Sequence, residues 1–330
     1  MLTPIKKGLV FALSGVAAAL AFSGGATAAD WPTKTIQMVV PFPAGSSPDL
    51  LARTLSEPMS QALGQTIVVE NKPGAGGNIG TRYAATAKPD GYTILLTING
   101  PMVTAPTLYK NTLGYDPLKD LQPISLVGTS PNVLLVPADS EATSVQEFIE
   151  LAKKEDGALN YGSVGAGSAS HLSMAMLEHE GGINLAHIPY SGFPQIISAV
   201  IAGDIHGTFM VPAIAMPQVN AGKARALAVT SLTASDLVPG LAPVAEMEGF
   251  EEFEAISWDA LFVPAGTPED IVTRLNGLTK EVLAMPEVQK KIRALYFTPQ
   301  WSTPEEMTAM IKSEKVRWDE VIERLELSLD

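Results

Sequence analysis

The sequence of 330 residues contains no cysteine, only four histidines and few aromatic residues, at 6%. Without cysteine no disulfide framework can support the fold, which must depend on its hydrophobic core. A bacterial lipoprotein anchor is excluded as well, because it needs a cysteine just after the signal segment. The histidines are scattered and show no metal-binding spacing such as H-E-x-x-H, so we expect no zinc or iron site and no cofactor.

Positive charge is also scarce. Lysine and arginine number 22 against 35 acidic residues, which gives a formal net charge of −13. Phosphate groups attract proteins that carry a positive field, so this balance argues against nucleic acid and anionic membrane surfaces as partners. A small anionic ligand is not excluded, because helix N-termini and backbone N–H groups bind a carboxylate without lysine or arginine.

The first 28 residues have the three-part pattern of a secretory signal peptide. Lys6 and Lys7 form a basic region, residues 8–22 form an apolar run, and residues 26–28 (Ala-Thr-Ala) form a cleavage pattern of small residues. The apolar run is too short to span a bilayer comfortably. We therefore expect residues 1–28 to be removed and the mature protein to be soluble in the periplasm.

The rest of the chain alternates short β-rich runs with helical patterns in two successive series. In the first series we expect strands at 35–42, 66–70 and 92–98, with helices at 48–63 and 78–87. In the second series we expect strands at 132–136, 159–163, 185–190, 205–211 and 224–230, with helices at 144–155, 168–180 and 194–202. Such alternation indicates parallel sheets covered by helices on both faces.

The length of the mature chain suits two domains better than one. A strand-like run at 255–263 and helices at 268–284 and 303–327 complete the chain, and Thr303 and Glu306 form a capping box before the last helix. The simplest organisation has crossovers near 126–133 and 256–262. Residues 29–130 and 256–330 then form a discontinuous lobe 1, and residues 131–255 form lobe 2. Paired crossover strands are a natural hinge for closure around a ligand.

Ligands of open α/β sheets bind at the carboxyl ends of the strands, near helix N-termini, so the loops that follow strands are the candidate sites. The loop at 41–49 leads into a helix and offers the Ser46 and Ser47 hydroxyl groups, with Phe42 as an apolar wall. The loop at 162–171 is rich in glycine and serine and forms a good carboxylate cradle at a helix start. An ordinary capped turn is the alternative for each loop.

Two glycine-rich segments, at 74–79 and at 162–171, are not dinucleotide fingerprints. Ile79 and Ser170 stand where the third glycine of G-x-G-x-x-G is required. The segment at 162–171 also lacks the G-x-S-x-G pattern of a nucleophile elbow. His171 is interpreted as orienting or packing beside its loop. Residues 189–192 present Tyr190 and Ser191 to a cleft, and residues 209–212 supply either an apolar ligand wall or ordinary core.

Seven ordered segments resemble the substrate-binding receptors of the tripartite tricarboxylate transporter system, often called Bug receptors. They are WPTKTIQMVVPFPAGSSPDLLAR, VVENKPGAGGNIGT, KPDGYTIL, LNYGSVGAGSASHLS, HIPYSG, AGKARALAVTS and LFVPAGTP. The resemblance implies an α/β fold of the type II periplasmic-binding-protein kind, a two-lobed Venus flytrap in which each lobe is a mostly parallel sheet flanked by helices. It also implies a receptor that is not an enzyme and delivers a small organic carboxylate to membrane permease subunits. We expect a monomer.

The resemblance also implies which residues contact the ligand. The positions that match the family pattern are Phe42, Ala44, Gly45, Ser46, Asp49, Ser163, Gly167, Ser168, His171, Tyr190 and Ser191. Met210 stands where relatives that bind amino acids often carry an aspartate. A ligand amine would be buried there without a counter-charge, which is costly. We therefore expect a dicarboxylate or an aromatic acid such as terephthalate, with preference for the aromatic acid.

Two other functions are alternatives to a transport receptor. A periplasmic sensor partner of a signalling kinase would have the same fold, and the sequence does not separate it from a transport receptor. An exported enzyme acting on carboxylates would need a nucleophile with its base or a set of metal ligands, and the sequence shows neither.

The first prediction concerns export. Protein purified from its native host should begin at Ala29 or Asp30, because the small-residue pattern at 26–28 is a cleavage signal. N-terminal sequencing measures this directly, and retention of Met1 would contradict it.

Overall fold

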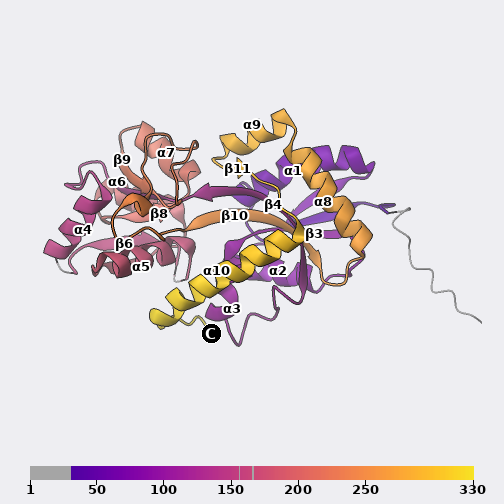
Figure 1. Cartoon of the computed structure of the whole chain (residues 1–330), viewed down its shortest axis with the longest axis horizontal. Helices are drawn as coiled ribbons and strands as arrows, with labels where there is room; N and C mark the ends of the chain where they lie inside the picture. The colour runs from indigo at the N-terminus through magenta and orange to yellow at the C-terminus, as the bar shows by residue number, and fades with distance from the viewer. Residues whose placement is uncertain (1–30, 156, 166) are drawn as a thin grey trace, which may run out of the picture.

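The computed structural model describes residues 31–155, 157–165 and 167–330 (Figure 1). The predicted signal segment at 1–28 and the predicted first residues of the mature chain lie outside these ranges. Within them, no helix is both long and apolar enough to cross a bilayer.

Lobe 1 is built on a six-stranded sheet in the order β11-β4-β10-β3-β1-β2. β1 pairs in parallel with β2 and with β3, as the alternation of strands and helices predicts. β10 runs antiparallel to β3 and β4, and the short β11 runs antiparallel to β4. The strands are β1 (Ile36–Val40), β2 (Ile67–Asn71), β3 (Thr93–Ile98), β4 (Leu121–Pro131), β10 (Ile256–Pro264) and β11 (Thr298–Pro299).

Helices cover both faces of this sheet because successive strand residues point to opposite sides. Met38 and Val40 join one hydrophobic cluster, whereas Val39 between them joins another. The first cluster packs against α1 (Ser47–Leu63), α8 (Glu269–Leu283) and α9 (Pro286–Ala294). The second packs against α2 (Asn78–Ala85), the π-helical turn η3 (Gly100–Thr104), α3 (Ala105–Leu108) and α10 (Pro304–Arg324).

Lobe 2 contains a three-stranded sheet in the order β8-β5-β9 and a parallel pair formed by β6 and β7. β5 runs antiparallel to β8 and β9, and a parallel bridge joins Tyr161 of β6 to Gly207 just before β8. The strands are β5 (Val133–Pro137), β6 (Asn160–Ser163), β7 (Ala186–Pro189), β8 (Thr208–Met210) and β9 (Ala224–Val229). The helices are α4 (Val145–Lys154), α5 (Ala169–Gly181), α6 (Phe193–Ala202) and α7 (Pro212–Asn220). Short 3₁₀ turns lie at η2 (Ala75–Gly77) in lobe 1 and η4 (Val244–Glu246) in lobe 2.

Each lobe receives one strand directly from the other lobe. β5 follows β4 after a single residue and enters lobe 2, and β10 returns the chain to lobe 1. Both of these strands run antiparallel to their neighbours, because they enter their sheets from the opposite end. The predicted two-lobed α/β fold is confirmed, with one antiparallel crossover strand added to the parallel set of each lobe.

A buried hydrogen-bond network joins the two crossovers. Asn132, the residue between β4 and β5, donates its side-chain N–H to the Ala255 carbonyl at 2.8 Å and its backbone N–H to Thr230 Oγ1 at 2.8 Å. Thr230 Oγ1 in turn donates to the same carbonyl at 2.7 Å. Every polar atom in this junction therefore has a partner, as a dry interior requires.

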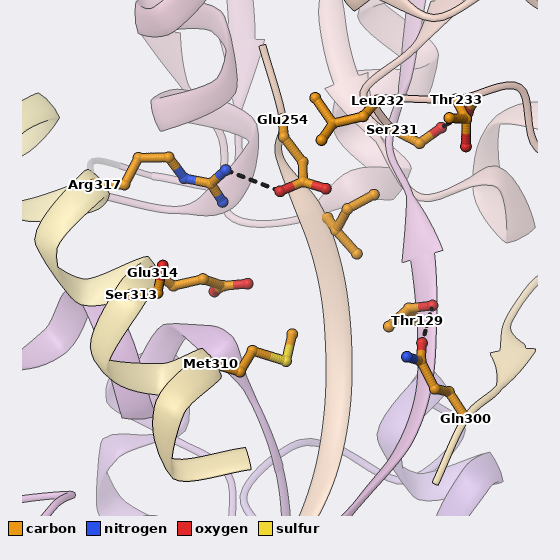
Figure 2. A pocket seen from close by; sticks show the side chains of 11 residues that line it. Thr129, Ser231, Leu232, Thr233, Glu254, Gln300, Met310, Ser313, Glu314 and Arg317 are labelled. Atoms are coloured by element: carbon orange, nitrogen blue, oxygen red, sulfur yellow. Dashed lines mark hydrogen bonds and ion pairs between the residues drawn. The ribbon is translucent and has the colours of Figure 1, made fainter. Parts of the chain in front are cut away.

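Helix α10 crosses from lobe 1 towards lobe 2 (Figure 1). Glu314 accepts a hydrogen bond from the Trp258 indole at 2.9 Å, and Arg317 pairs with Glu254 at 3.0 Å. A cavity of about 450 Å³ lies between this helix and the crossover strands (Figure 2). Thr129 and Gln300 line its opposite wall. One hydrophobic cluster, which includes Trp258, continues from lobe 1 into lobe 2 on this face.

Several element boundaries differ from the sequence prediction. α7 and α9 were not predicted, because α7 starts at Pro212 and contains Pro217, a residue that normally ends a helix, and α9 is short. Pro268 was expected inside the first turn of its helix, yet it is the N-cap residue of α8. The capping box between Thr303 and Glu306 is confirmed.

The second prediction concerns Glu314. Burial raises the pKa of this carboxyl to about 7, against the opposing effects of the Trp258 hydrogen bond and the Arg317 charge. A raised folded-state pKa contributes stability below the unfolded value, and that contribution is lost as the pH rises through about 7. Glu314→Gln keeps an acceptor for Trp258 but cannot ionise, so it should raise the free energy of unfolding at pH 8 by about 2–3 kcal/mol.

Urea unfolding at pH 5 and pH 8 measures this effect. The gain should be small at pH 5, where the wild-type carboxyl is largely protonated in the folded state. An equal difference between the two proteins at both pH values would show that ionisation of Glu314 does not determine it.

Candidate ligand-binding site

The loop after β1 places Ser46 at the N-cap of α1. Its backbone is extended, with φ −70° and ψ 159°, and its hydroxyl does not cap the helix. The Oγ atom is buried and has no hydrogen-bond partner among the residues described. The first-turn N–H groups of a helix have no intrahelical acceptor. Because Pro48 lacks an N–H, this end of α1 offers an anion the Ser46 hydroxyl and the N–H groups of Ser47 and Asp49.

The Asp49 carboxylate holds this loop in place instead of facing a ligand. It accepts hydrogen bonds from Gly45 N–H at 2.8 Å, Asn71 Nδ2 at 2.9 Å and Arg53 Nε at 3.0 Å, and it pairs with the second Arg53 nitrogen at 3.0 Å. Asn71 also donates to the Phe42 carbonyl at 3.0 Å. Burial alone would raise the pKa of Asp49, but these hydrogen bonds and the Arg53 charge outweigh it, so the pKa is lowered.

The loops after β1, β2 and β3 meet at one edge of the lobe 1 sheet. Gly77 has φ +99°, and a Cβ atom there would lie 2.7 Å from the Phe42 ring and 2.9 Å from Pro101. Only glycine allows this approach without displacing a neighbour. Phe42 is therefore half-buried between loops, and only part of its ring is accessible.

In lobe 2, the loop after β6 forms its own hydrogen-bond network at the start of α5. Ser168 is the N-cap residue, accepts a hydrogen bond from His171 N–H at 3.3 Å and donates to the Gly165 carbonyl at 2.7 Å. The buried Ser163 Oγ accepts from Gly165 N–H at 3.1 Å, and Gly167 N–H donates to His171 Nδ1 at 2.9 Å. The structure therefore brings Ser163, Gly167, Ser168 and His171 together, as the sequence suggests.

This loop is electrically neutral at pH 7. Burial, with a smaller contribution from His187, lowers the pKa of His171 to about 4. Burial also lowers the pKa of His187. In lobe 1, the charge of Arg53 is balanced by Asp49. Each lobe thus offers an anion the partial positive charge and N–H donors of a helix N-terminus, and lobe 1 adds the Ser46 hydroxyl.

The remaining predicted residues have different surroundings. Tyr190 N–H donates to the Ser163 carbonyl at 2.8 Å, and this hydrogen bond ties the loop after β7 to the loop after β6. Ser191 is exposed and bonds to the Gln195 side chain. Ala44 is exposed. Met210 and Phe209 are 1% and 0% exposed and belong to the hydrophobic core, so they do not form the apolar wall that was one of the expectations.

Two cavities lie elsewhere in the described ranges of the structure. Neither the cavity of about 450 Å³ beside α10 nor one of about 390 Å³ in lobe 2 is lined by a predicted site residue. The residues form one group at the strand ends of each lobe, so a ligand that contacts both groups must bridge the lobes. Among the described residues, no group of three or more His, Asp or Glu side chains is placed to hold a metal ion.

Three supporting residues were missed in the sequence. Arg53 follows Asp49 by four positions on α1, and that spacing alone could have revealed the pair. Asn71 and His187 reach their loops from β2 and β7, so no local pattern in the chain points to them.

Comparison with known proteins shows the family of this chain. The chain matches the family described as "Tripartite tricarboxylate transporter family receptor" over residues 51–327. The chain belongs to this family. Its members are periplasmic solute-binding receptors that work with a tripartite transporter, which confirms the predicted resemblance.

Several similar proteins align with almost the whole length of this chain. Protein BugT of Bordetella pertussis strain Tohama I is 33% identical over 319 residues, which are 96% of this chain and 94% of BugT. The solved structure of R. palustris Rpa4515 with adipate has 32% identity and a TM-score of 0.81, covering 91% of this chain and 99% of that chain. MatC (Rpa3494) from Rhodopseudomonas palustris with bound malate has 29% identity and a TM-score of 0.76, covering 88% and 100%.

The third prediction concerns Asp49. Asp49→Asn removes the charge that Arg53 and Gly45 N–H share, so it should lower the free energy of unfolding at pH 7 by about 1–3 kcal/mol. The pKa of Asp49 is lowered in the folded receptor, so its contribution is present above the unfolded pKa and is lost as the pH falls through the folded pKa. The difference between variant and wild type should therefore shrink at pH 3.

Urea unfolding at pH 7 and pH 3 measures both values. Glu57→Gln is the matched control, because Glu57 is an exposed carboxylate on the same helix. A loss at pH 7 that is as large for Glu57→Gln would contradict a specific role of the Asp49 network.

Proposed function

We propose that this receptor binds an aliphatic dicarboxylate between its two lobes. One ligand carboxylate is held at the N-terminus of α1 in lobe 1 and the other at the N-terminus of α5 in lobe 2. The observation that carries the proposal is the buried Ser46 hydroxyl, which has no partner among the described residues although it stands at the start of a 17-residue helix. A buried hydroxyl without a partner is unfavourable, and a ligand carboxylate would supply the missing acceptor.

The pairing of two neutral, donor-rich ends favours two carboxylates over one. Each end has the N–H donors of a helix start, and lobe 1 adds the Ser46 hydroxyl. In lobe 1 no carboxylate is left to meet a ligand ammonium, because the oxygens of Asp49 are already bonded. The bound molecules of the two related structures, adipate and malate, are both dicarboxylates. Amino-acid ligands are disfavoured, since their ammonium group would be buried without a counter-charge.

An aliphatic chain fits better than an aromatic ring. The preference for an aromatic acid depended on apolar surface from Phe42, Phe209, Met210 and Val211, and Phe209 and Met210 lie in the core of the receptor. Phe42 and Val211 remain, but both are half-buried. The gain from burying a ring scales with the apolar area removed from water, so two partly covered side chains provide little.

The proposal extends to the role of the protein. The receptor acts without catalysis, since the Ser163 hydroxyl that contacts His187 is engaged in holding its own loop. It works as a monomer in the periplasm after loss of residues 1–28, with lobes formed by residues 29–130 plus 256–330 and by residues 131–255. It closes on its ligand by bending at the crossovers and passes the ligand to membrane permease subunits.

The fourth prediction tests the ligand. A ligand that binds only the folded receptor raises its melting temperature. Thermal-shift measurements, followed by calorimetry, should place adipate, succinate and malate above terephthalate, phthalate, citrate and glutamate. Tightest binding by glutamate would contradict the dicarboxylate, and tightest binding by terephthalate would contradict the aliphatic chain.

Ser46→Ala assigns the observed affinity to the proposed site. It should weaken adipate binding by about 1–3 kcal/mol, the cost of losing one hydrogen bond to a charged group. The melting temperature without ligand should not fall, because the hydroxyl has no partner among the described residues. Ser168→Ala is the contrasting variant, since it removes a helix N-cap and should also lower stability by about 1 kcal/mol.

A further inference from the structure

Three aromatic rings stack behind the proposed carboxylate cradle of lobe 2. The imidazole of His187, on β7, lies 4.1 Å from that of His171, on α5, with an angle of 12° between the ring planes. The Tyr161 ring, on β6, lies 5.0 Å from His187 and 6.2 Å from His171. Tyr161 and His171 are buried, and His187 is half-buried. Three separate elements thus meet in one rigid cluster.

Each imidazole of the stack holds one end of the loop between β6 and α5. His187 Nε2 lies 2.6 Å from Ser163 Oγ, at the end of β6. His171 Nδ1 accepts the Gly167 N–H at 2.9 Å, immediately before the N-cap residue of α5. Because the two rings are stacked, the separation of the two loop ends is set by the thickness of the stack.

The hydrogen bonds of this loop determine which atoms of the cluster carry protons. The Gly165 carbonyl accepts Ser168 N–H at 3.2 Å and Ser168 Oγ–H at 2.7 Å, which occupies both of its lone pairs. The Ser163 proton therefore goes to His187 Nε2, which lies 2.6 Å from the Ser163 oxygen. His171 Nδ1 is likewise an acceptor. Both imidazoles are neutral in this arrangement, in agreement with the lowered pKa values of His171 and His187.

The loop has little other support at Gly165, where φ is +112° and a Cβ atom would meet nothing within 4 Å among the described residues. At Gly167, with φ +74°, a Cβ atom would overlap the Leu108 side chain, so this end of the loop also packs against Leu108. Glycine in open space leaves the backbone with many alternative conformations. The donors that face a ligand at the start of α5 therefore depend on the side chains that fix Ser163 and Gly167.

We propose that His187 is a positioning residue for ligand binding: through Ser163 and the stacked His171 it holds the N–H groups at the start of α5 in the geometry that accepts a carboxylate. This inference rests on the proposed function, because it assigns one ligand carboxylate to that helix end. His187 itself does not touch the ligand.

The test compares His187→Phe with His187→Gln. The phenylalanine keeps a stacking ring but has no acceptor for Ser163, whereas the glutamine carboxamide has one. His187→Phe should weaken adipate binding by about tenfold or more, the effect of leaving the buried Ser163 hydroxyl without its partner. Amide hydrogen exchange at Gly165 and Gly167 should accelerate by a similar factor in the ligand-free variant. His187→Gln should recover most of both losses.

His206→Phe is the matched control. His206 is another half-buried histidine of lobe 2, but it bonds to Asn160 at the opposite end of β6 and should leave adipate affinity unchanged. Wild-type affinity and exchange in His187→Phe would overturn the inference, as would equal losses in His187→Gln and His187→Phe. If the wild-type receptor does not bind adipate, the proposed ligand fails, and the exchange rates of Gly165 and Gly167 still decide the role of His187.

Discussion

The antiparallel pairing of β4 with β10 is the constraint on which the rest of the receptor depends. These strands carry the chain between lobes and pair from Ile256 with Pro131 to Pro264 with Leu121. Asn132, Thr230 and the Ala255 carbonyl close the pairing where the lobes begin. Because this junction is buried, breaking any one of its hydrogen bonds would leave a polar group without a partner. Sliding of one of these strands along the other would break this register.

The pairing of β4 with β10 explains where the proposed ligand-binding groups of the two lobes lie. Each lobe orders its parallel strands beside one crossover strand, so the carboxyl ends of β1, β2 and β3 gather at one edge of lobe 1 and those of β6 and β7 in lobe 2. Helices that follow these strands start at the same edges, with Ser46 and Ser168 as N-cap residues. A protein with a net charge of −13 can therefore attract an anion locally, through helix ends and hydroxyl groups instead of full charges.

Much of this arrangement could be predicted from local patterns. Glycine and serine after a β-rich run indicated both helix starts, and the alternation of strands and helices indicated the two-lobed fold. Local patterns failed where a residue acts across the sheet. Asp49 was predicted to contact the ligand, but Arg53 and Asn71 occupy its carboxylate, so only its backbone N–H is left for an anion. Met210 was considered for the ligand wall, yet packing against β5 and α6 buries it in the core.

The sequence by itself determined the class of the fold and the two serine-capped helix starts that follow strands, because periodicity, turn residues and helix caps act over a few neighbouring positions. Its resemblance in seven ordered segments indicated the family. Only the tertiary structure decided which of those loop residues still have an unused group. Ser46 keeps a hydroxyl without a partner in the described chain, whereas Asp49 and Ser163 have theirs occupied. The partners come from distant strands, and hydrogen-bond satisfaction depends on neighbours in space.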